Sequence, residues 1–153
     1  MNVDEGSLPG WHGKLPSLGD FASRRLPPDF LEAWDGWLAA GLGALRETAA
    51  DTWLDGYLAS PIWRFLLLPG VVPGDSGKQA WAGVLMPSVD RAGRYFPFTV
   101  AWALPVLPRD GDSFTALHRW LRFRLGAGIA AAFARADRRR GLGERLVQHH
   151  TRL

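Results

Sequence analysis

The residues best suited to chemistry lie in one short loop between two apolar runs. Ser88, Asp90, Arg91 and Arg94 fall within seven positions. A hydroxyl, a carboxylate and two guanidiniums at this spacing can bind an anion or complete a catalytic site. The alternative is structural, with Asp90 pairing with an arginine and capping the turn. Both interpretations stay open, and a protein-binding edge is compatible with either.

A second motif, Gly74-Asp75-Ser76-Gly77, matches the sequence around the nucleophile of chymotrypsin-like proteases. That chemistry needs a histidine base oriented by an aspartate, and the only upstream histidine is His12, in a turn-rich setting. Glycine, aspartate and serine are also ordinary residues of surface loops. Because Lys78 follows Gly74 so closely, the stretch is too short for a phosphate-binding P-loop. We therefore predict a loop without catalytic function.

Cysteine and histidine give no metal-binding pattern. The chain has no cysteine, which excludes disulfides, thiolate ligands and thiolate nucleophiles. His118, His149 and His150 lack the i, i+4 spacing with an intervening carboxylate that a metal-binding helix shows. We expect neither a metal nor another cofactor.

The apolar runs that flank the first loop, Trp81–Met86 and Tyr95–Leu104, predict two paired strands. In the second run large apolar residues alternate with small ones, so one face is large and the other small. We expect the large face in the core and a helix against the small one, which would bury the pair in mid-sheet. Pro97 predicts a bulge or a late strand start. The large residues are Phe96, Phe98, Val100, Trp102 and Leu104.

Two long helices are predicted outside this central pair. The first begins at Asp29, with Glu32 at capping-box spacing. Its apolar face comprises Phe30, Trp34, Trp37, Leu38, Leu42 and Leu45. The second is capped by Asp112 or Ser113, and the glycine pair Gly126 and Gly128 is expected to interrupt it. Its apolar face comprises Phe114, Leu117, Leu121 and Leu125.

Three shorter elements complete the predicted order. A strand starts near Gly10, a short helix starts at Asp51 or Thr52, and Ile62–Leu68 is predicted as a buried strand. Arg64 inside that strand needs a partner or a strand end near solvent. The order is strand, helix, helix, then three strands and two helices. It predicts a single α+β domain with a mainly antiparallel sheet flanked by helices.

Length and charge narrow the class of protein. The chain has 153 residues, enough for one hydrophobic core, and a net charge of +3. Residues 119–153 hold nine arginines against Asp137 and Glu144, a net +7, which leaves −4 for the remainder. Such a basic segment is usually a solvated face, and we do not expect nucleic-acid binding.

The N-terminus lacks signal-peptide features and no apolar run reaches membrane-spanning length, so we expect a cytoplasmic protein.

Four segments together resemble the TagF (ImpM) family of type VI secretion accessory proteins. They are GWHGKLPSLGDF at 10–21, LPPDFLEAWDGWL at 26–38, WLDGYLASPIWRFLLLPG at 53–70 and WAGVLMPSVDRAGRYFPFTV at 81–100. The resemblance covers about residues 10–105, in the family's order, within a single TagF-like domain at 1–153. Residues 112–153 are expected to form a helical, arginine-rich C-terminal part.

The resemblance implies a cytoplasmic, non-enzymatic factor that represses assembly or firing of the type VI apparatus after translation. In this family the repressor acts through the forkhead-associated scaffold protein, and some relatives are fused to the phosphatase of the same pathway. Both are therefore expected partners, the scaffold first. The residues carried over as a candidate partner-binding surface are Lys14, Asp20, Arg25, Trp81, Ser88, Asp90, Arg91 and Arg94. The alternative is a small enzyme or phosphate-binding protein that uses Ser88, Asp90 and Arg94.

Overall fold

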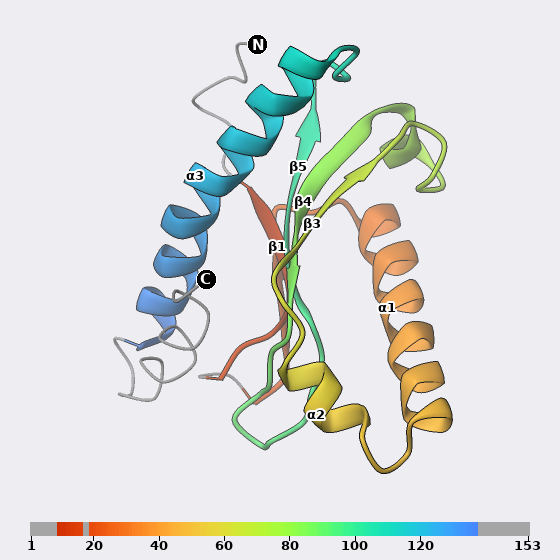
Figure 1. Ribbon diagram of the computed structural model, residues 1–153, viewed down its shortest axis with the longest axis vertical. Helices are drawn as coiled ribbons and strands as arrows, with labels where there is room; N and C mark the ends of the chain where they lie inside the picture. The colour runs from red at the N-terminus through yellow and green to blue at the C-terminus, as the bar shows by residue number, and fades with distance from the viewer. Residues whose placement is uncertain (1–8, 17–18, 138–153) are drawn as a thin grey trace.

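Five strands form one antiparallel sheet with helices on both faces (Figure 1). The computed structural model describes residues 9–16 and 19–137. Across the sheet the strand order is β2-β1-β5-β4-β3, and every neighbouring pair is antiparallel. The strands are β1 (Gly10–Lys14), β2 (Phe21–Arg24), β3 (Trp63–Leu67), β4 (Ala80–Met86) and β5 (Phe98–Leu104). The predicted single α+β domain with a mainly antiparallel sheet is confirmed.

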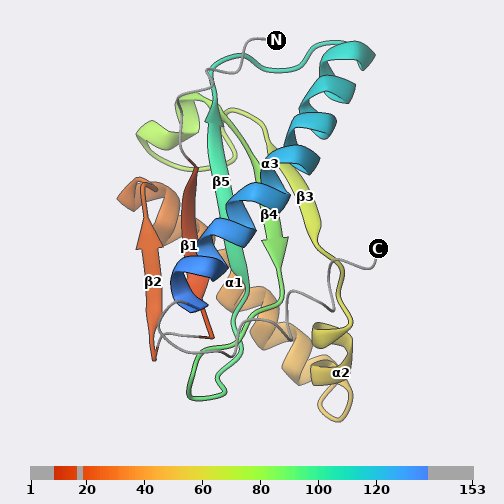
Figure 2. The ribbon, with the colours of Figure 1, turned by 90° about the vertical axis from the view of Figure 1, so that its left-hand side faces the viewer.

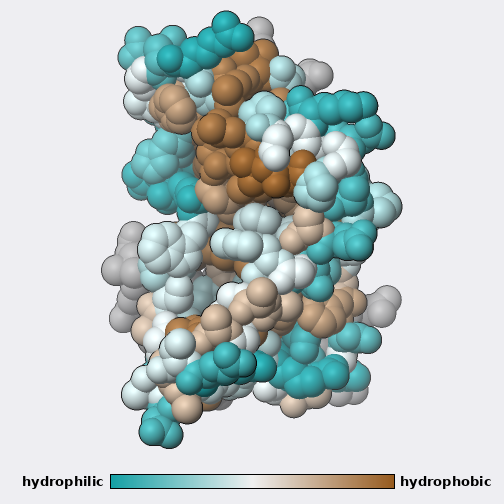
Figure 3. Space-filling view, turned by 90° about the vertical axis from the view of Figure 1, so that its right-hand side faces the viewer, coloured by the Kyte–Doolittle hydropathy of each residue, from teal (hydrophilic) through white to brown (hydrophobic). Residues whose placement is uncertain are grey.

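Two long helices cover opposite faces of the sheet. Helix α1 (Pro28–Thr48) lies on one face, and α3 (Gly111–Asp137) crosses the other (Figure 2). The short helix α2 (Trp53–Leu58) follows α1, and a 3-10 turn, η1 (Asp75–Lys78), lies between β3 and β4. The sheet is therefore the middle of three layers. Seen from the α1 side, apolar side chains gather in the upper half of the surface, bordered by polar ones (Figure 3).

The pair β4–β5 occupies the interior of the sheet, as its composition predicts. The two strands are paired along their whole length, from Ala80 with Leu104 to Met86 with Phe98. Strand β5 begins directly after Pro97, which agrees with the predicted late start. Its large residues face α3. Its small residues face α1, so the pair is buried on both sides.

The two faces of the sheet carry separate hydrophobic cores. On the α3 side, Leu117 and Leu121 of the helix pack against β4 and β5, and Trp102 meets Trp120 edge-on at 4.9 Å between ring centroids. The buried residues of this core include Val84, Phe98, Val100, Trp102 and Leu104. These side chains are apolar on both partners, so burial holds α3 against the sheet.

The α1-side core is built around aromatic side chains. Phe30 is fully buried and its ring lies 4.4 Å from that of Trp81. The indole Nε1–H of Trp34 donates to Thr99 Oγ1 at 2.8 Å, which satisfies one buried polar group of α1 and one on the small face of β5. The helical residues buried here are Phe30, Trp34, Leu38 and Leu42. The predicted α1 face is thus confirmed at four of its six positions.

Two details of α1 differ from the prediction. The helix begins at Pro28 without a side-chain cap, so the expected capping box is wrong. Asp29 instead accepts hydrogen bonds from the backbone N–H and the hydroxyl of Ser76, at 2.8 and 2.6 Å. Trp37 is 62% exposed, and Leu45 also lies at the surface. Both positions fall at the edge of the apolar stripe, where the sheet no longer covers them.

The predicted buried strand at Ile62–Leu68 is an edge strand. Among the strands that the structure describes, β3 pairs only with β4, and Trp63 and Arg64 are exposed. Arg64 Nη1 lies 3.1 Å from His118 Nε2 of α3, which answers the need for a partner. A continuous apolar run is typical of a strand that is buried on both faces, but β3 lies at the edge of the sheet. Strand β2, at the opposite edge, was not predicted, since FASR is only four residues long and has no extended apolar pattern.

Phe96 and helix α3 also differ from expectation. Phe96 packs in the α1-side core, opposite to its predicted face, because β5 begins only after Pro97 and the alternation does not extend back. Helix α3 continues through Gly126 and Gly128. Its cap is Asp110: Asp110 Oδ1 accepts the Ser113 N–H at 2.7 Å, and Ser113 Oγ accepts the Asp110 N–H at 3.1 Å. Phe114 is exposed.

Candidate functional site

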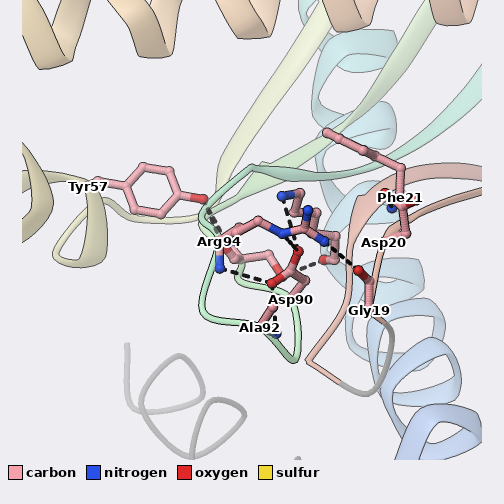
Figure 4. A network of polar contacts seen from close by, with 9 residues as sticks. Gly19, Asp20, Phe21, Tyr57, Asp90, Ala92 and Arg94 are labelled. Carbon is pink, nitrogen blue, oxygen red and sulfur yellow. Dashed lines mark hydrogen bonds and ion pairs between the residues drawn. The ribbon is translucent and has the colours of Figure 1, made fainter.

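Asp90 is the centre of a polar network in the loop that joins β4 to β5 (Figure 4). Its side chain is 0% exposed. One carboxylate oxygen accepts the backbone N–H groups of Ala92 and Arg94, each at 2.9 Å. The other lies 2.8 Å from Arg94 Nε and 3.1 Å from Lys14 Nζ. These contacts make Asp90 both the cap of its own turn and the anchor of two cations.

Lys14 brings strand β1 into this network. Its side chain is only 8% exposed, so the ion pair with Asp90 compensates a buried ammonium. The same ammonium lies 5.0 Å from the centre of the Phe21 ring on the neighbouring strand β2. The β4–β5 loop is therefore attached to the β1–β2 hairpin by a buried charge pair.

Ser88 and Tyr57 attach the loop on its other side. The Ser88 hydroxyl donates to the Lys14 carbonyl oxygen at 2.6 Å. The Ser88 backbone N–H donates to the Tyr57 hydroxyl, which in turn donates to the Ser88 carbonyl, both at 2.8 Å. Because its hydroxyl is bound and buried, Ser88 is placed to hold the loop rather than to attack a substrate.

The network changes the acidity of two groups. Burial of the Asp90 carboxylate opposes ionisation, but hydrogen bonds from the Arg94 backbone, Lys14 and the Arg94 side chain outweigh it and lower the pKa of Asp90 to about 2. Burial raises the pKa of Tyr57 to about 12, against the opposing effects of the Ser88 hydrogen bond and the Arg46 charge. Asp90 is thus a permanent anion and Tyr57 a neutral hydroxyl at physiological pH.

Three charged residues of the predicted set face solvent around this anchor. Arg94 has a side chain 56% exposed, and its guanidinium also donates to the Gly19 carbonyl beside the β1–β2 turn. Arg91 is exposed and lies next to Gly19, and Asp20 is exposed in the same turn. We call Asp20, Arg91 and Arg94 the loop surface. A rigid support beneath exposed charged groups suits recognition of a partner.

The other two predicted residues lie away from the loop surface. Trp81 belongs to the α1-side core and is 4% exposed, with its Nε1–H donating to the Ser76 carbonyl at 2.9 Å. Arg25 follows β2 at a positive φ of 58°, and its Nε–H donates to the Pro9 carbonyl at 2.7 Å. The set therefore divides into buried supports, an exposed loop surface and one residue beyond β2.

The remaining chemical motifs have structural partners in the described part of the chain. Ser76 of the protease-like motif donates to Asp29, while His12 lies 3.0 Å from Asp35, so serine and histidine do not meet. Within residues 9–16 and 19–137 no group of three metal-ligand side chains is close enough to hold an ion. His149 and His150 lie outside the described residues.

Comparison with known proteins shows the family to which the chain belongs. The model of the TagF N-terminal domain, type VI secretion system-associated, matches residues 10–145. The chain belongs to this family. The match extends beyond the sequence resemblance at 10–105, so α3 is part of the family domain in this TagF-family chain. No curated protein matches the chain.

A solved structure is also similar. The crystal structure of PA0076 from Pseudomonas aeruginosa PAO1 shares 52% sequence identity with this chain at a TM-score of 0.60. The similarity covers 64% of this chain and 43% of PA0076, so this chain corresponds to less than half of that protein. Among the helices that the structure describes, none combines the length and apolar character needed to cross a bilayer.

Proposed function

We propose that this TagF-family chain is a non-enzymatic, cytoplasmic accessory protein that represses assembly or firing of the type VI secretion apparatus after translation. It acts by binding the forkhead-associated scaffold protein of the system, and the pathway phosphatase is a second candidate partner. Family membership supports the link to type VI secretion. The repressor role and both partners follow from the family resemblance.

We assign the contact to the loop surface. The observation that carries this assignment is the Asp90 network, which holds Arg91 and Arg94 in a supported, solvent-facing loop beside Asp20. Ordering the loop backbone and the Arg94 side chain in advance lowers the entropy lost on binding. Ser88 and Asp90 are committed to hydrogen bonds inside the protein, so nothing in their geometry favours the enzyme alternative.

The test is a pull-down of the scaffold and the phosphatase from cell extract with the wild-type chain and an Arg91→Glu variant. Reversal of an exposed charge should reduce scaffold capture at least about tenfold, as expected for a central interfacial arginine. The same variant, when overexpressed, should no longer repress secretion. An Asp90→Ala variant is less informative, because it would leave the Lys14 charge buried without its partner.

Arg122→Glu is the matched control. Arg122 is an exposed residue of α3, on the opposite face of the sheet, and the substitution changes the net charge by the same amount. It should capture the scaffold like the wild type. Equal capture by Arg91→Glu and wild type would reject the loop surface as the contact, and a wild-type chain that captures no secretion component would reject the regulator role.

A further inference from the structure

A hollow of about 450 Å³ lies between the second half of α1, the first turn of α2 and the β4–β5 loop. Its volume falls within the range of small-molecule sites, roughly 300–1,000 Å³. Three cationic side chains line it: Lys14 of β1, Arg46 of α1 and Arg94 of the loop. Elements far apart in the sequence therefore bring positive charge to one concave place.

The charges of the hollow are not balanced. Asp90, sealed behind the wall, pairs with Lys14 and Arg94, so the three cations retain a net charge of about +2. Among the described residues that line the hollow, none carries a carboxylate. Within the described part of the chain, Arg46 makes no salt bridge, and its guanidinium lies 4.6 Å from the centre of the Trp53 ring. Arg46 has its hydrogen-bond donors available for a ligand, and Arg94 keeps those that are not bound to Asp90 and Gly19.

Aromatic rings form the rest of the wall. Trp53, Tyr95 and Phe96 line the hollow together with the cations. Trp53 and Tyr95 meet edge-on at 6.0 Å, so their faces are held at a defined angle. Rings of this kind bind flat apolar groups by stacking. The Arg46 guanidinium is already held against one of these rings, which orders it before any ligand arrives.

We propose that this hollow binds an aromatic phosphate monoester. A phosphate monoester carries a charge of about −1.5 to −2 near neutral pH and matches the excess positive charge of the lining. Arginine suits its oxygens because a guanidinium can donate two parallel hydrogen bonds. Arg46 is the principal phosphate ligand, Arg94 the second, and Trp53 and Tyr95 hold the ring. The proposal is independent of the repressor role, since it concerns the isolated chain.

Isothermal titration calorimetry of the purified chain with phenyl phosphate tests the site. We expect saturable binding that is at least about tenfold tighter than for inorganic phosphate or phenol, because inorganic phosphate lacks the aromatic ring and phenol lacks the phosphate. Adenosine monophosphate is titrated in parallel. Tighter binding of adenosine monophosphate would identify a nucleotide-like ligand, and tighter binding of phenyl phosphate a simple aryl phosphate. If neither binds at millimolar concentration, the proposal is rejected.

Variants locate the binding within the protein. Arg46→Gln and Trp53→Leu should each weaken phenyl phosphate binding at least about tenfold, and Arg46→Lys should restore part of the loss. Arg122→Gln, which removes a charge from α3 on the opposite face, should bind within twofold of wild type. Equal weakening by Arg46→Gln and Arg122→Gln would mean general charge attraction and would overturn the site. Circular dichroism confirms that each variant is folded. Arg46 is exposed, so its replacement is expected to preserve the fold.

Discussion

At the scale of single residues, the protein uses its charged groups mainly as internal supports. Asp90 accepts hydrogen bonds from two backbone N–H groups and pairs with Lys14 and Arg94. A buried carboxylate with this many donors is stable only as an anion. Asp29 has a related role, since it joins the start of α1 to Ser76, and these hydrogen bonds lower the pKa of Asp29. Both carboxylates hold distant segments together.

The low pKa of Asp90 predicts how stability responds to acid. Its pKa of about 2 in the folded protein lies below the ordinary 3.8. The stabilisation is therefore complete above about pH 4 and is lost as the pH falls towards 2, because protonation removes the negative charge that pairs with Lys14 and Arg94. Asp90→Asn should be less stable than wild type at pH 7, and the difference should shrink between pH 4 and pH 2. Urea denaturation at a series of pH values measures it.

A control separates this effect from general acid denaturation. Asp51→Asn replaces an exposed carboxylate after α1 and should keep the wild-type dependence on pH. A stability difference between wild type and Asp90→Asn that stays constant from pH 7 to pH 2 would contradict the assignment of the charge pair.

At the scale of elements, α1 is long and amphipathic but carries glycines on its open side. Gly36 and Gly41 lie inside the helix, and an added Cβ would meet no atom within 4 Å at either position. Glycine is unfavourable in a helix interior because its backbone loses more conformational freedom on folding. The buried face fixes the position of α1 on the sheet. The glycines on the exposed face make the helix less stable than alanines at the same positions would.

Gly41→Ala should therefore stabilise the protein, raising the free energy of unfolding by about 0.5–1 kcal/mol. Urea denaturation measures the change. Gly83→Ala in β4 is the contrasting variant, because its Cβ would lie 2.3 Å from the Val100 carbonyl oxygen and 2.6 Å from the Phe65 ring. That substitution should lower the free energy of unfolding by about 1–3 kcal/mol through overpacking. The same sign for both variants would refute the described helix and sheet environments.

Element by element, local patterns were predicted well and long-range partners were not. The size alternation of β5 correctly predicted a strand buried on both faces, since side-chain direction follows directly from a two-residue repeat. A continuous apolar run cannot distinguish an edge strand from a central one, so β3 was wrongly predicted to be buried. The capping box at Asp29 failed because its partner, Ser76, lies 47 positions away.

In the candidate site, too, the residues of one loop were predictable from the sequence and their distant partners were not. Ser88, Asp90 and Arg94 were recognised together because they fall in one loop. Their partners were not predictable from spacing, since Lys14 lies 74 positions from Ser88 and Gly19 lies 75 positions from Arg94. Tyr57, which holds the loop from α2, lies in a segment for which the sequence predicted only a short helix. Contacts of this range depend on the assembled sheet.

At the scale of the whole molecule, two cores share one pair of strands. Strands β4 and β5 contribute side chains to the α1-side core from one face and to the α3-side core from the other. Loss of packing on either side removes support from the same backbone. The domain is therefore expected to unfold as one cooperative unit, as small single domains usually do.

A variant in one core tests this coupling. Leu117→Ala removes a buried side chain of α3 and should lower the free energy of unfolding by about 2–5 kcal/mol. With 5-fluorotryptophan incorporated, fluorine NMR can follow Trp34 in the α1-side core and Trp102 in the α3-side core separately. Both native signals should disappear at the same, lowered urea concentration. Phe123→Ala, at a 79% exposed position of the same helix, should change stability by less than about 0.5 kcal/mol. If Trp102 loses its native signal at a urea concentration where Trp34 keeps it, the two cores are independent and the shared strands do not couple them.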